Sequence, residues 1–410
     1  MSITYYPNLI GSSTEHKSYV GEYTSKGRLE VSTAETVFFN TFQYGIETDV
    51  WDTSTSTGGT AVFDGTLSAI QMGVTSSIGS ESIRQTLNCQ RYIPSRQSEL
   101  TFAVRLETPV VGIRRRLGLF DGADGFYFED NGGDYACVLI NSDGGTPIID
   151  RVSRTSWNGD KLDGTGPSGL TADPTALQII CMNYEWYGAG QIKFNFIIDG
   201  KKILVHTFST ANRSALPWCK TPFLPIRLEL KNVTGAAGNH YMWQGSNSLI
   251  MEGGTSKLGI GQNLLSPVAG TTLTTANTFY PVLSIRLKST DLGGIVLPTA
   301  FQAATLDNTS IFFKLLRNAT LTGGTWVDMP DANSFVQYNE TATAITGGTN
   351  LFSGFIPPNT GGNPILLDPN TQYQLGRQSM GTVSDTVTVA IAATVANKSG
   401  VASLNWIEQR

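Results

Sequence analysis

The chain has 410 residues, of which 40% are hydrophobic and only 15% are charged, with 44 glycines and 17 prolines. Its apolar content is ample for buried cores, and many turn formers with few charges fit an all-β protein better than a helical one. A net charge of −5 argues against a protein that binds nucleic acid mainly by electrostatic attraction. No apolar stretch approaches the length of a membrane span, so we expect none.

Composition divides the chain into four segments. Residues 1–40 are polar and predict an N-terminal arm or attachment segment. Residues 41–250 are rich in candidate strands and predict a two-sheet sandwich of jelly-roll or lectin-like type. Residues 251–271 are rich in Gly, Ser and Thr and predict a linker, and residues 272–410 predict a smaller C-terminal β domain.

The expected strands alternate apolar and polar residues, which places successive side chains on opposite faces of a sheet. In the first domain they cover residues 36–44, 61–63, 68–72, 100–106, 115–120, 125–128, 135–140, 178–183, 191–198, 203–208 and 226–230. In the second they cover residues 281–287, 294–297, 310–317, 325–329, 350–355, 386–392 and 402–409.

The clearest hairpin signal joins two of these runs. Asp199-Gly200 lies between residues 191–198 and 203–208. An Asp-Gly pair at this place predicts a type I′ turn, because that turn needs a positive φ at both central residues.

Three consecutive arginines, Arg114, Arg115 and Arg116, form a basic run inside an expected strand. In a strand they cannot all share one face, so at most two point the same way. We interpret them as a solvated edge or an inter-subunit ion-pair site in preference to a nucleic-acid contact.

Several aromatic residues lie in or beside expected loops, and we single out Trp157, Trp186, Tyr187 and Trp218. Exposed aromatics at the end of a sandwich stack on sugar rings or anchor subunit contacts, whereas buried ones only close the core. We divide them between packing and interface, with sugar contact as the minority interpretation. The sugar-binding alternative predicts that two or more of Trp157, Trp186 and Trp218 are exposed on one concave face.

Acidic residues surround an aromatic segment at Asp121, Asp124, Glu129 and Asp130. A glycosidase needs two carboxylates a fixed distance apart, but the DGADG stretch is also typical of a hairpin turn. The segment lacks the later glutamate of an EF-hand calcium loop. We predict a turn, while a glycan-degrading enzyme would need a cleft that holds two of these carboxylates.

Other signs of chemistry are weak. The four cysteines are far apart and form no CxxC or Cys/His spacing, so we expect no metal and no cofactor. His206 lies alone in an expected strand and is more typical of a packed residue than of a catalytic base. With no phosphate loop, nucleophile elbow or dinucleotide fingerprint, we predict that the protein is not an enzyme and has no catalytic residues.

Four segments carry a family resemblance. GIRRRLGLFDGADGFYFE (112–129), SWNGDKLDGTGPSG (156–169), YEWYGAGQIKFNFIIDGK (184–201) and TPFLPIRLEL (221–230) resemble uncharacterised virion structural proteins of tailed bacteriophages, many from aquatic phages. In the C-terminal domain, YPVLSIRLKS and ASLNWIEQ are similar to the same proteins. The resemblance covers most of residues 85–410 and weakens before them.

This resemblance implies a virion component made in the host cytoplasm and located in the tail, baseplate or fibre, or on the capsid surface as a decoration protein. Its expected partners are itself, as a trimer or ring, and other virion proteins, with no nucleic acid among them. It supplies no catalytic residues. Two alternatives remain open: a carbohydrate-binding module that recognises a host-surface glycan, and a glycan-degrading enzyme.

Overall fold

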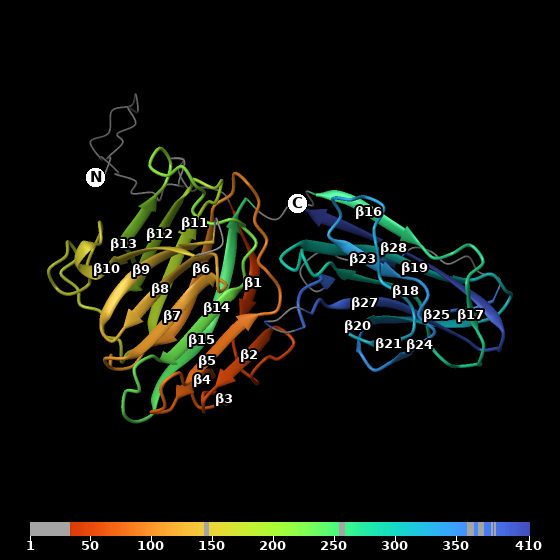
Figure 1. The fold of residues 1–410 in the computed structure, drawn as a ribbon, viewed down its shortest axis with the longest axis horizontal. Coiled ribbons are helices and arrows are strands. Elements are labelled where there is room, and N and C mark those ends of the chain that lie inside the picture. Colours follow the sequence, from red (N-terminus) through yellow and green to blue (C-terminus); the bar gives the residue numbers. More distant parts are fainter. Residues whose placement is uncertain are drawn as a thin grey trace, which may run out of the picture.

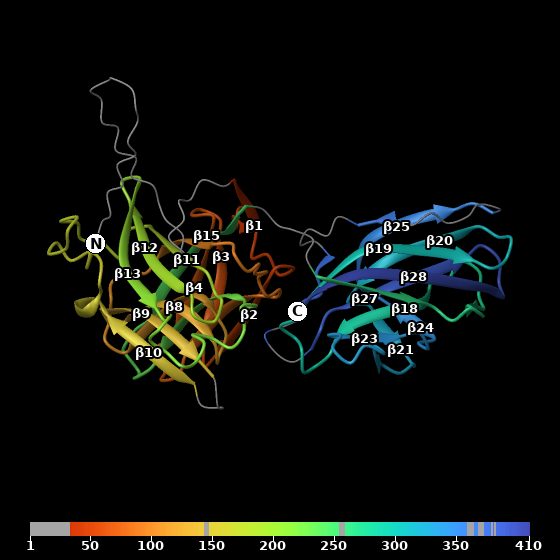
Figure 2. The same cartoon turned by 90° about the horizontal axis from the view of Figure 1, so that it is seen from above.

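The computed structural model describes residues 33–142, 147–253, 259–358, 365–367, 373–378, 380 and 383–410. Within them the regular elements are β-strands, apart from one 3-10 turn at Arg154–Ser156. The all-β prediction is therefore confirmed. Figures 1 and 2 show the strands gathered into two bodies placed end to end, with the strands up to β15 in the larger one and those from β16 onward in the smaller.

The larger body is a sandwich of two antiparallel sheets. Its eight-stranded sheet has the order β13 (Lys201–Ser209), β12 (Gln191–Ile198), β11 (Gln178–Tyr184), β6 (Ser98–Arg105), β15 (His240–Glu252), β4 (Ala69–Val74) and β3 (Thr60–Asp64), with β1 (Ala34–Asn40) also paired to β15. Its seven-stranded sheet has the order β10 (Ile148–Ser153), β9 (Asp134–Asn141), β8 (Gly125–Asn131), β7 (Ile113–Phe120), β14 (Ile226–Asn232), β5 (Glu81–Thr86) and β2 (Trp51–Ser56).

The core of this sandwich lies between the two sheets. In β6, Leu100, Phe102 and Val104 are fully buried while the residues between them are partly exposed, as the period of two in a strand dictates. From the facing sheets, Phe126 and Phe194 meet edge to face with ring centroids 6.3 Å apart. Such a pair contributes about 0.5–1.5 kcal/mol beyond its buried area.

The predicted hairpin at Asp199-Gly200 joins β12 to β13. Asp199 has φ +52° and Gly200 has φ +71°, and Ile198 is paired with Lys201 across the turn. Both central residues therefore adopt the left-handed conformation that the sequence predicts.

The smaller body is also built from packed antiparallel sheets. One has the order β16 (Ile260–Leu265), β28 (Lys398–Gln409), β19 (Ile295–Thr305) and β26 (Ile365–Leu366), with β17 (Thr271–Leu273) paired to β28. The other has the order β22 (Val327–Asp328), β23 (Val336–Asn339), β18 (Tyr280–Leu287), β27 (Thr386–Ala393), β20 (Ile311–Arg317) and β25 (Thr349–Ile356), and β21 (Thr320–Thr322) pairs separately with β24 (Ala344–Thr346). The chain is thus a jelly-roll or lectin-like sandwich followed by a smaller β unit.

Some strands fall where the sequence predicts none. β16 and β17 begin in the expected linker. β1 overlaps the strand expected at residues 36–44 but begins earlier, inside the segment expected to be an arm, whose residues 1–32 are outside the described residues. β2 (WDTSTS) and β5 (ESIRQT) carry too many polar residues to show apolar alternation. Their strand conformation is fixed by pairing with neighbours distant in sequence.

The two bodies contact each other along a seam that includes Leu87 and Cys89 of the larger body and Gln374 and Arg377 of the smaller one. The Arg377 N–H donates to the Leu87 carbonyl at 3.1 Å, and the Gln374 side chain donates to the Cys89 carbonyl at 2.9 Å. Cys89 also packs in a small apolar cluster with Ile295 and Leu297 of β19.

Candidate functional site

The three consecutive arginines lie on β7, in the middle of the seven-stranded sheet. Arg115 points inward and is fully buried, whereas Arg114 and Arg116 point to the outer face of the sheet. The prediction of a solvated edge is wrong, because β7 is paired on both sides, with β8 and β14. Alternation along the strand was foreseen correctly, but its position within the sheet could not be read from alternation.

Arg115 forms an internal ion pair. Its Nη1 lies 2.7 Å from Asp130 Oδ2, and both side chains have an exposed fraction of at most 1%. The other carboxylate oxygen of Asp130 accepts a hydrogen bond from the Gly133 N–H at 2.7 Å. These contacts satisfy two charges inside the sandwich, so Arg115 and Asp130 are inaccessible to a ligand.

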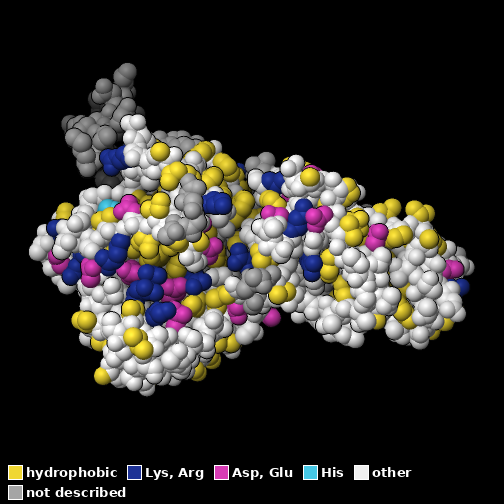
Figure 3. Space-filling view, in the orientation of Figure 1, with side chains coloured by type: hydrophobic (Ala, Val, Ile, Leu, Met, Phe, Trp, Pro, Cys, Tyr) yellow, Lys and Arg dark blue, Asp and Glu magenta, His cyan; other side chains and the backbone are white. Residues whose placement is uncertain are grey.

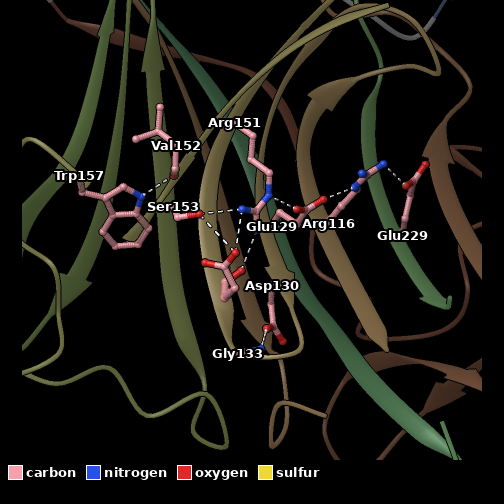
Figure 4. A network of polar contacts seen from close by, with 10 residues as sticks. Arg116, Glu129, Asp130, Gly133, Arg151, Val152, Ser153, Trp157 and Glu229 are labelled. Carbon is pink, nitrogen blue, oxygen red and sulfur yellow. Dashed lines mark hydrogen bonds and ion pairs between the residues drawn. The ribbon is translucent and has the colours of Figure 1, made fainter. Parts of the chain in front are cut away.

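On the outer face of the same sheet, arginines and glutamates from β10, β8, β7 and β14 form a continuous row of contacts (Figure 4). Arg116 Nε lies 2.7 Å from Glu129 Oε2, and Arg116 Nη1 lies 3.6 Å from Glu229 Oε2. Glu129 also accepts a hydrogen bond from Arg151 Nε at 2.7 Å, and Glu229 accepts one from Arg227 Nε at 2.7 Å. The row Arg151, Glu129, Arg116, Glu229 and Arg227 alternates in charge; we call it the charged row.

Register explains why these side chains meet. Arg116 is the direct cross-strand partner of both Glu129 on β8 and Glu229 on β14. Directly opposed residues in an antiparallel pair have Cβ atoms about 4.5–5.5 Å apart on one face, so opposite charges there attract. At the margins, Arg151 also contacts Asp134 at 2.8 Å, and Lys231 contacts Glu81 at 3.0 Å.

A cluster of apolar residues lies on the same outer face of the sheet, beneath the arginine side chains. Phe120, Tyr127, Ala136, Val138 and Ile140 form a separate buried cluster. The Arg116 guanidinium lies 4.7 Å from the Tyr127 ring centroid, and the Arg227 guanidinium lies 5.6 Å from that of Phe120. The long stems of the arginines thus cover apolar surface while their charged ends stay partly exposed. Figure 3 shows basic and acidic side chains gathered with hydrophobic ones on this side of the larger body.

Burial and neighbouring charges act in opposite directions on Arg116. Burial alone would lower its pKa, but the Tyr127 hydroxyl and the Glu129 and Glu229 carboxylates outweigh burial and leave the pKa raised. Arg116 is therefore a fixed cation. The glutamates around it are held by strand positions and ion pairs, so the face is preorganised.

The aromatic candidates are mostly packed. Trp157 and Trp218 are buried, and their ring N–H groups donate to the Val152 and Trp186 carbonyls at 3.1 and 3.3 Å. Trp186 is partly buried and donates to the Cys219 carbonyl at 3.1 Å. The exposed pair of tryptophans on one face that the sugar-binding alternative predicted is therefore absent, and these three tryptophans do not form a sugar site.

Tyr187 differs from the tryptophans because 45% of it is exposed. Its hydroxyl lies 2.7 Å from the Ser95 hydroxyl, and its ring lines a surface depression of about 520 Å³ with Arg213. This depression is on the eight-stranded side of the sandwich, so Tyr187 and the charged row do not form one site.

The acidic candidates separate into different environments. Asp121 accepts hydrogen bonds from the Ala123 and Asp124 N–H groups, as expected for the predicted turn. Asp124 is buried and accepts from Ser142 Oγ at 2.6 Å and from the Lys220 N–H at 2.8 Å. Glu129 is thus the member of this group that the structure places in the charged row.

His206 is packed as expected. It is 6% exposed, lies edge-on to Phe208 with ring centroids 4.5 Å apart, and accepts a hydrogen bond at Nδ1 from the Asn158 N–H. Burial lowers its pKa to about 4. Among the described residues, no group of three or more His, Cys, Asp or Glu side chains is arranged to hold a metal ion.

Sequence reasoning missed Arg151, Arg227 and Glu229. Arg227 and Glu229 lie two residues apart on β14 and therefore share a face, which is the signal that could have identified them. Their proximity to Arg116 depends on the neighbouring positions of β7 and β14, which the sequence pattern does not encode.

Comparison with known proteins identifies no matching family model and no matching curated protein. Solved structures do match, over about half of this chain. Cellulose induced protein Cip1 matches with a TM-score of 0.34 and 12% identity over 52% of this chain and 96% of that one. A legume lectin-like domain from Entamoeba histolytica matches with a TM-score of 0.31 and 13% identity, over 51% of this chain and 95% of that one. A glycosyl hydrolase family protein from Mycobacterium fortuitum matches with a TM-score of 0.36 and 13% identity, over 52% of this chain and 99% of that one.

The prediction that the chain is not an enzyme is contradicted by this comparison, because the matched structures include proteins named as glycosyl hydrolases and a β-1,3-glucanase from Mycobacterium marinum. At these identities and TM-scores the likeness assigns neither an activity nor any residue role to this chain. In the described part of the chain no helix is long and apolar enough to cross a membrane.

Proposed function

We propose that this protein binds a glycan through the charged row on the outer face of its seven-stranded sheet. The observation that carries the proposal is the unbroken alternation of guanidinium and carboxylate groups from β10 to β14. Its arginines are partly accessible, with exposed side-chain fractions of 19% for Arg116, 27% for Arg151 and 14% for Arg227.

Sugar hydroxyl groups suit such a surface because each both donates and accepts hydrogen bonds. Guanidinium groups are donors only, and ionised carboxylates are acceptors only, so an alternating row offers both to successive hydroxyls. Ion pairs already hold the side chains in place, which reduces the entropy lost on binding. Sites on sheet strands are also more rigid than sites on loops.

We further propose that this binding takes place on a tailed-phage particle, of which the protein is a structural component. Two of the segments that resemble phage virion proteins, 112–129 and 221–230, supply Arg116, Glu129, Arg227 and Glu229 of the row. A particle that carries several copies in a homo-oligomer would convert weak single contacts into strong attachment.

The binding proposal is tested with Arg151→Gln and Glu129→Gln. Each removes one charge of the row, and each should weaken binding to a polysaccharide panel about tenfold or more, in line with the ~1.5–3 kcal/mol of a charge-assisted hydrogen bond. Affinity electrophoresis gives the binding constants, and near-UV circular dichroism checks that each variant is folded.

Arg213→Gln is the matched control, because Arg213 is exposed on the other side of the sandwich. Binding that is equal in the wild type and both row variants would contradict the proposal. Binding that is lost only in Arg213→Gln would move the glycan site to the Tyr187 depression.

The particle setting has its own test. Negative-stain images of intact particles labelled with an antibody to the chain should show regular decoration of the head or tail, and light scattering should give an oligomer mass. If the protein is a monomer and is absent from particles, the proposal that it is a structural component of a phage particle is contradicted. The glycan-binding proposal is not affected by that result.

A further inference from the structure

The basic side chains around the charged row differ in whether they have partners. Arg116, Arg151, Arg227 and Lys231 each contact a carboxylate at 3.0 Å or less. In the described part of the chain, Arg114 has no comparable ion pair or hydrogen bond, although it lies on the same outer face two positions from Arg116.

The residues around Arg114 do not neutralise its positive charge at close range. Its cross-strand partners are Lys231 on β14 and Asn131 on β8, neither of which carries a negative charge. Glu129 and Glu229 attract it at longer range but are already engaged by Arg116. The nearby Lys231 is in turn engaged by Glu81.

Arg114 is also partly withdrawn from water. Burial, and then repulsion from Arg116, lower the pKa of Arg114. A half-buried guanidinium beside like charges is stabilised by any anion that reaches it, and its planar fork matches a carboxylate, sulfate or phosphate group.

We infer that the glycan bound by the charged row is acidic, and that Arg114 is the residue that receives its anionic group. This inference rests on the proposed glycan-binding function and adds the class of ligand. The hydroxyl groups of the sugar contact the alternating charges of the row, while the anionic substituent binds Arg114, which lies beside the middle of the row. The excess positive charge is local, since the protein as a whole has a net charge of −5.

Matched pairs of polymers test this inference. Polygalacturonate and its full methyl ester share one backbone and differ in the carboxylate, and dextran sulfate and dextran differ in the sulfate. The wild type should bind at least one charged polymer about tenfold or more tightly than its neutral counterpart. The pair that shows the preference identifies the anionic group.

Arg114→Gln should abolish this preference while leaving affinity for the neutral polymer unchanged. Because Arg114 has no ion pair in the described structure, its replacement leaves no carboxylate without a partner, and folding should be retained. Arg213→Gln serves as the control for general electrostatic attraction and should keep the preference.

The outcomes separate the two proposals. Equal binding of charged and neutral polymers, or equal loss of the preference in Arg114→Gln and Arg213→Gln, overturns the acidic-ligand inference and leaves glycan binding intact. If none of the four polymers binds, both proposals are overturned. A preference that disappears only in Arg114→Gln supports the inference.

Discussion

At the scale of single residues, Arg114, Arg115 and Arg116 show how strongly environment separates identical side chains. Arg115 is sealed in the core with Asp130, Arg116 is shared between Glu129 and Glu229, and Arg114 lies beside them with no close anion among the described residues. Arg115 and Arg116 are adjacent in the strand and therefore lie on opposite faces of the sheet. Arg114 and Arg116 share a face but have different cross-strand neighbours, so only Arg116 has a close carboxylate partner.

The buried pair leads to a stability prediction. Asp130→Asn leaves the Arg115 charge buried without its counter-ion, which should lower the free energy of unfolding by about 3–5 kcal/mol. Urea denaturation measures the change. Asp150→Asn, at an exposed position, is the control and should change stability by less than about 0.5 kcal/mol.

Replacing both partners by apolar residues, Arg115→Met with Asp130→Leu, should recover most of that loss, because neither charge is then left buried alone. If Asp130→Asn were as stable as the wild type, the Arg115–Asp130 pair would not be buried in solution.

At the scale of elements, the backbone of β8 leaves no room for a side chain at Gly118 of β7. A Cβ atom added there would lie 2.2 Å from the Phe126 carbonyl oxygen and 2.6 Å from the Tyr127 Cα. Both are backbone atoms and cannot move aside without shifting β8. The close spacing at Gly118 thus supports the register that places Arg116 opposite Glu129.

Gly118→Ala should therefore destabilise the protein by about 1–3 kcal/mol, the usual cost of overpacking. Gly122→Ala is the matched control, since no atom lies within 4 Å of its added Cβ. Thermal unfolding of the two variants measures the difference. Equal midpoints would show that the space between β7 and β8 accommodates a methyl group at position 118.

Whether a strand could be predicted from the sequence depended on the signal within that strand. Runs such as β6 and the Asp199-Gly200 hairpin carry their signal locally, in alternation and in turn chemistry. Polar strands such as β2 and β5 carry no local signal. The charged row combines residues from β10, β8, β7 and β14, and its assembly depends on strand order, which alternation does not specify.

At the scale of the whole molecule, Cys89 lies among the contacts that join the two bodies. The thiol is buried, and burial raises its pKa to about 11, so it should react slowly with alkylating reagents. Its reactivity therefore reports on the seam between the bodies.

Leu297→Ser, which removes an apolar neighbour of Cys89, should make alkylation of Cys89 several-fold faster than in the wild type. Peptide mass spectrometry follows the reaction, with the buried Cys137 and Cys181 as internal references. Leu306→Ser, at an exposed leucine, should have no such effect. An unchanged rate in Leu297→Ser would show that this cluster does not protect Cys89.

The long strand β15 has a consequence for the order in which the protein is made. β6 lies along one side of β15, while β4 and β1 occupy successive parts of the other side. During synthesis β1, β4 and β6 therefore leave the ribosome well before residues 240–252, which pair with all three. Until then they expose unpaired edges that can associate with other chains. The larger sandwich closes late, and its folding is expected to be slow because its contacts join distant parts of the chain.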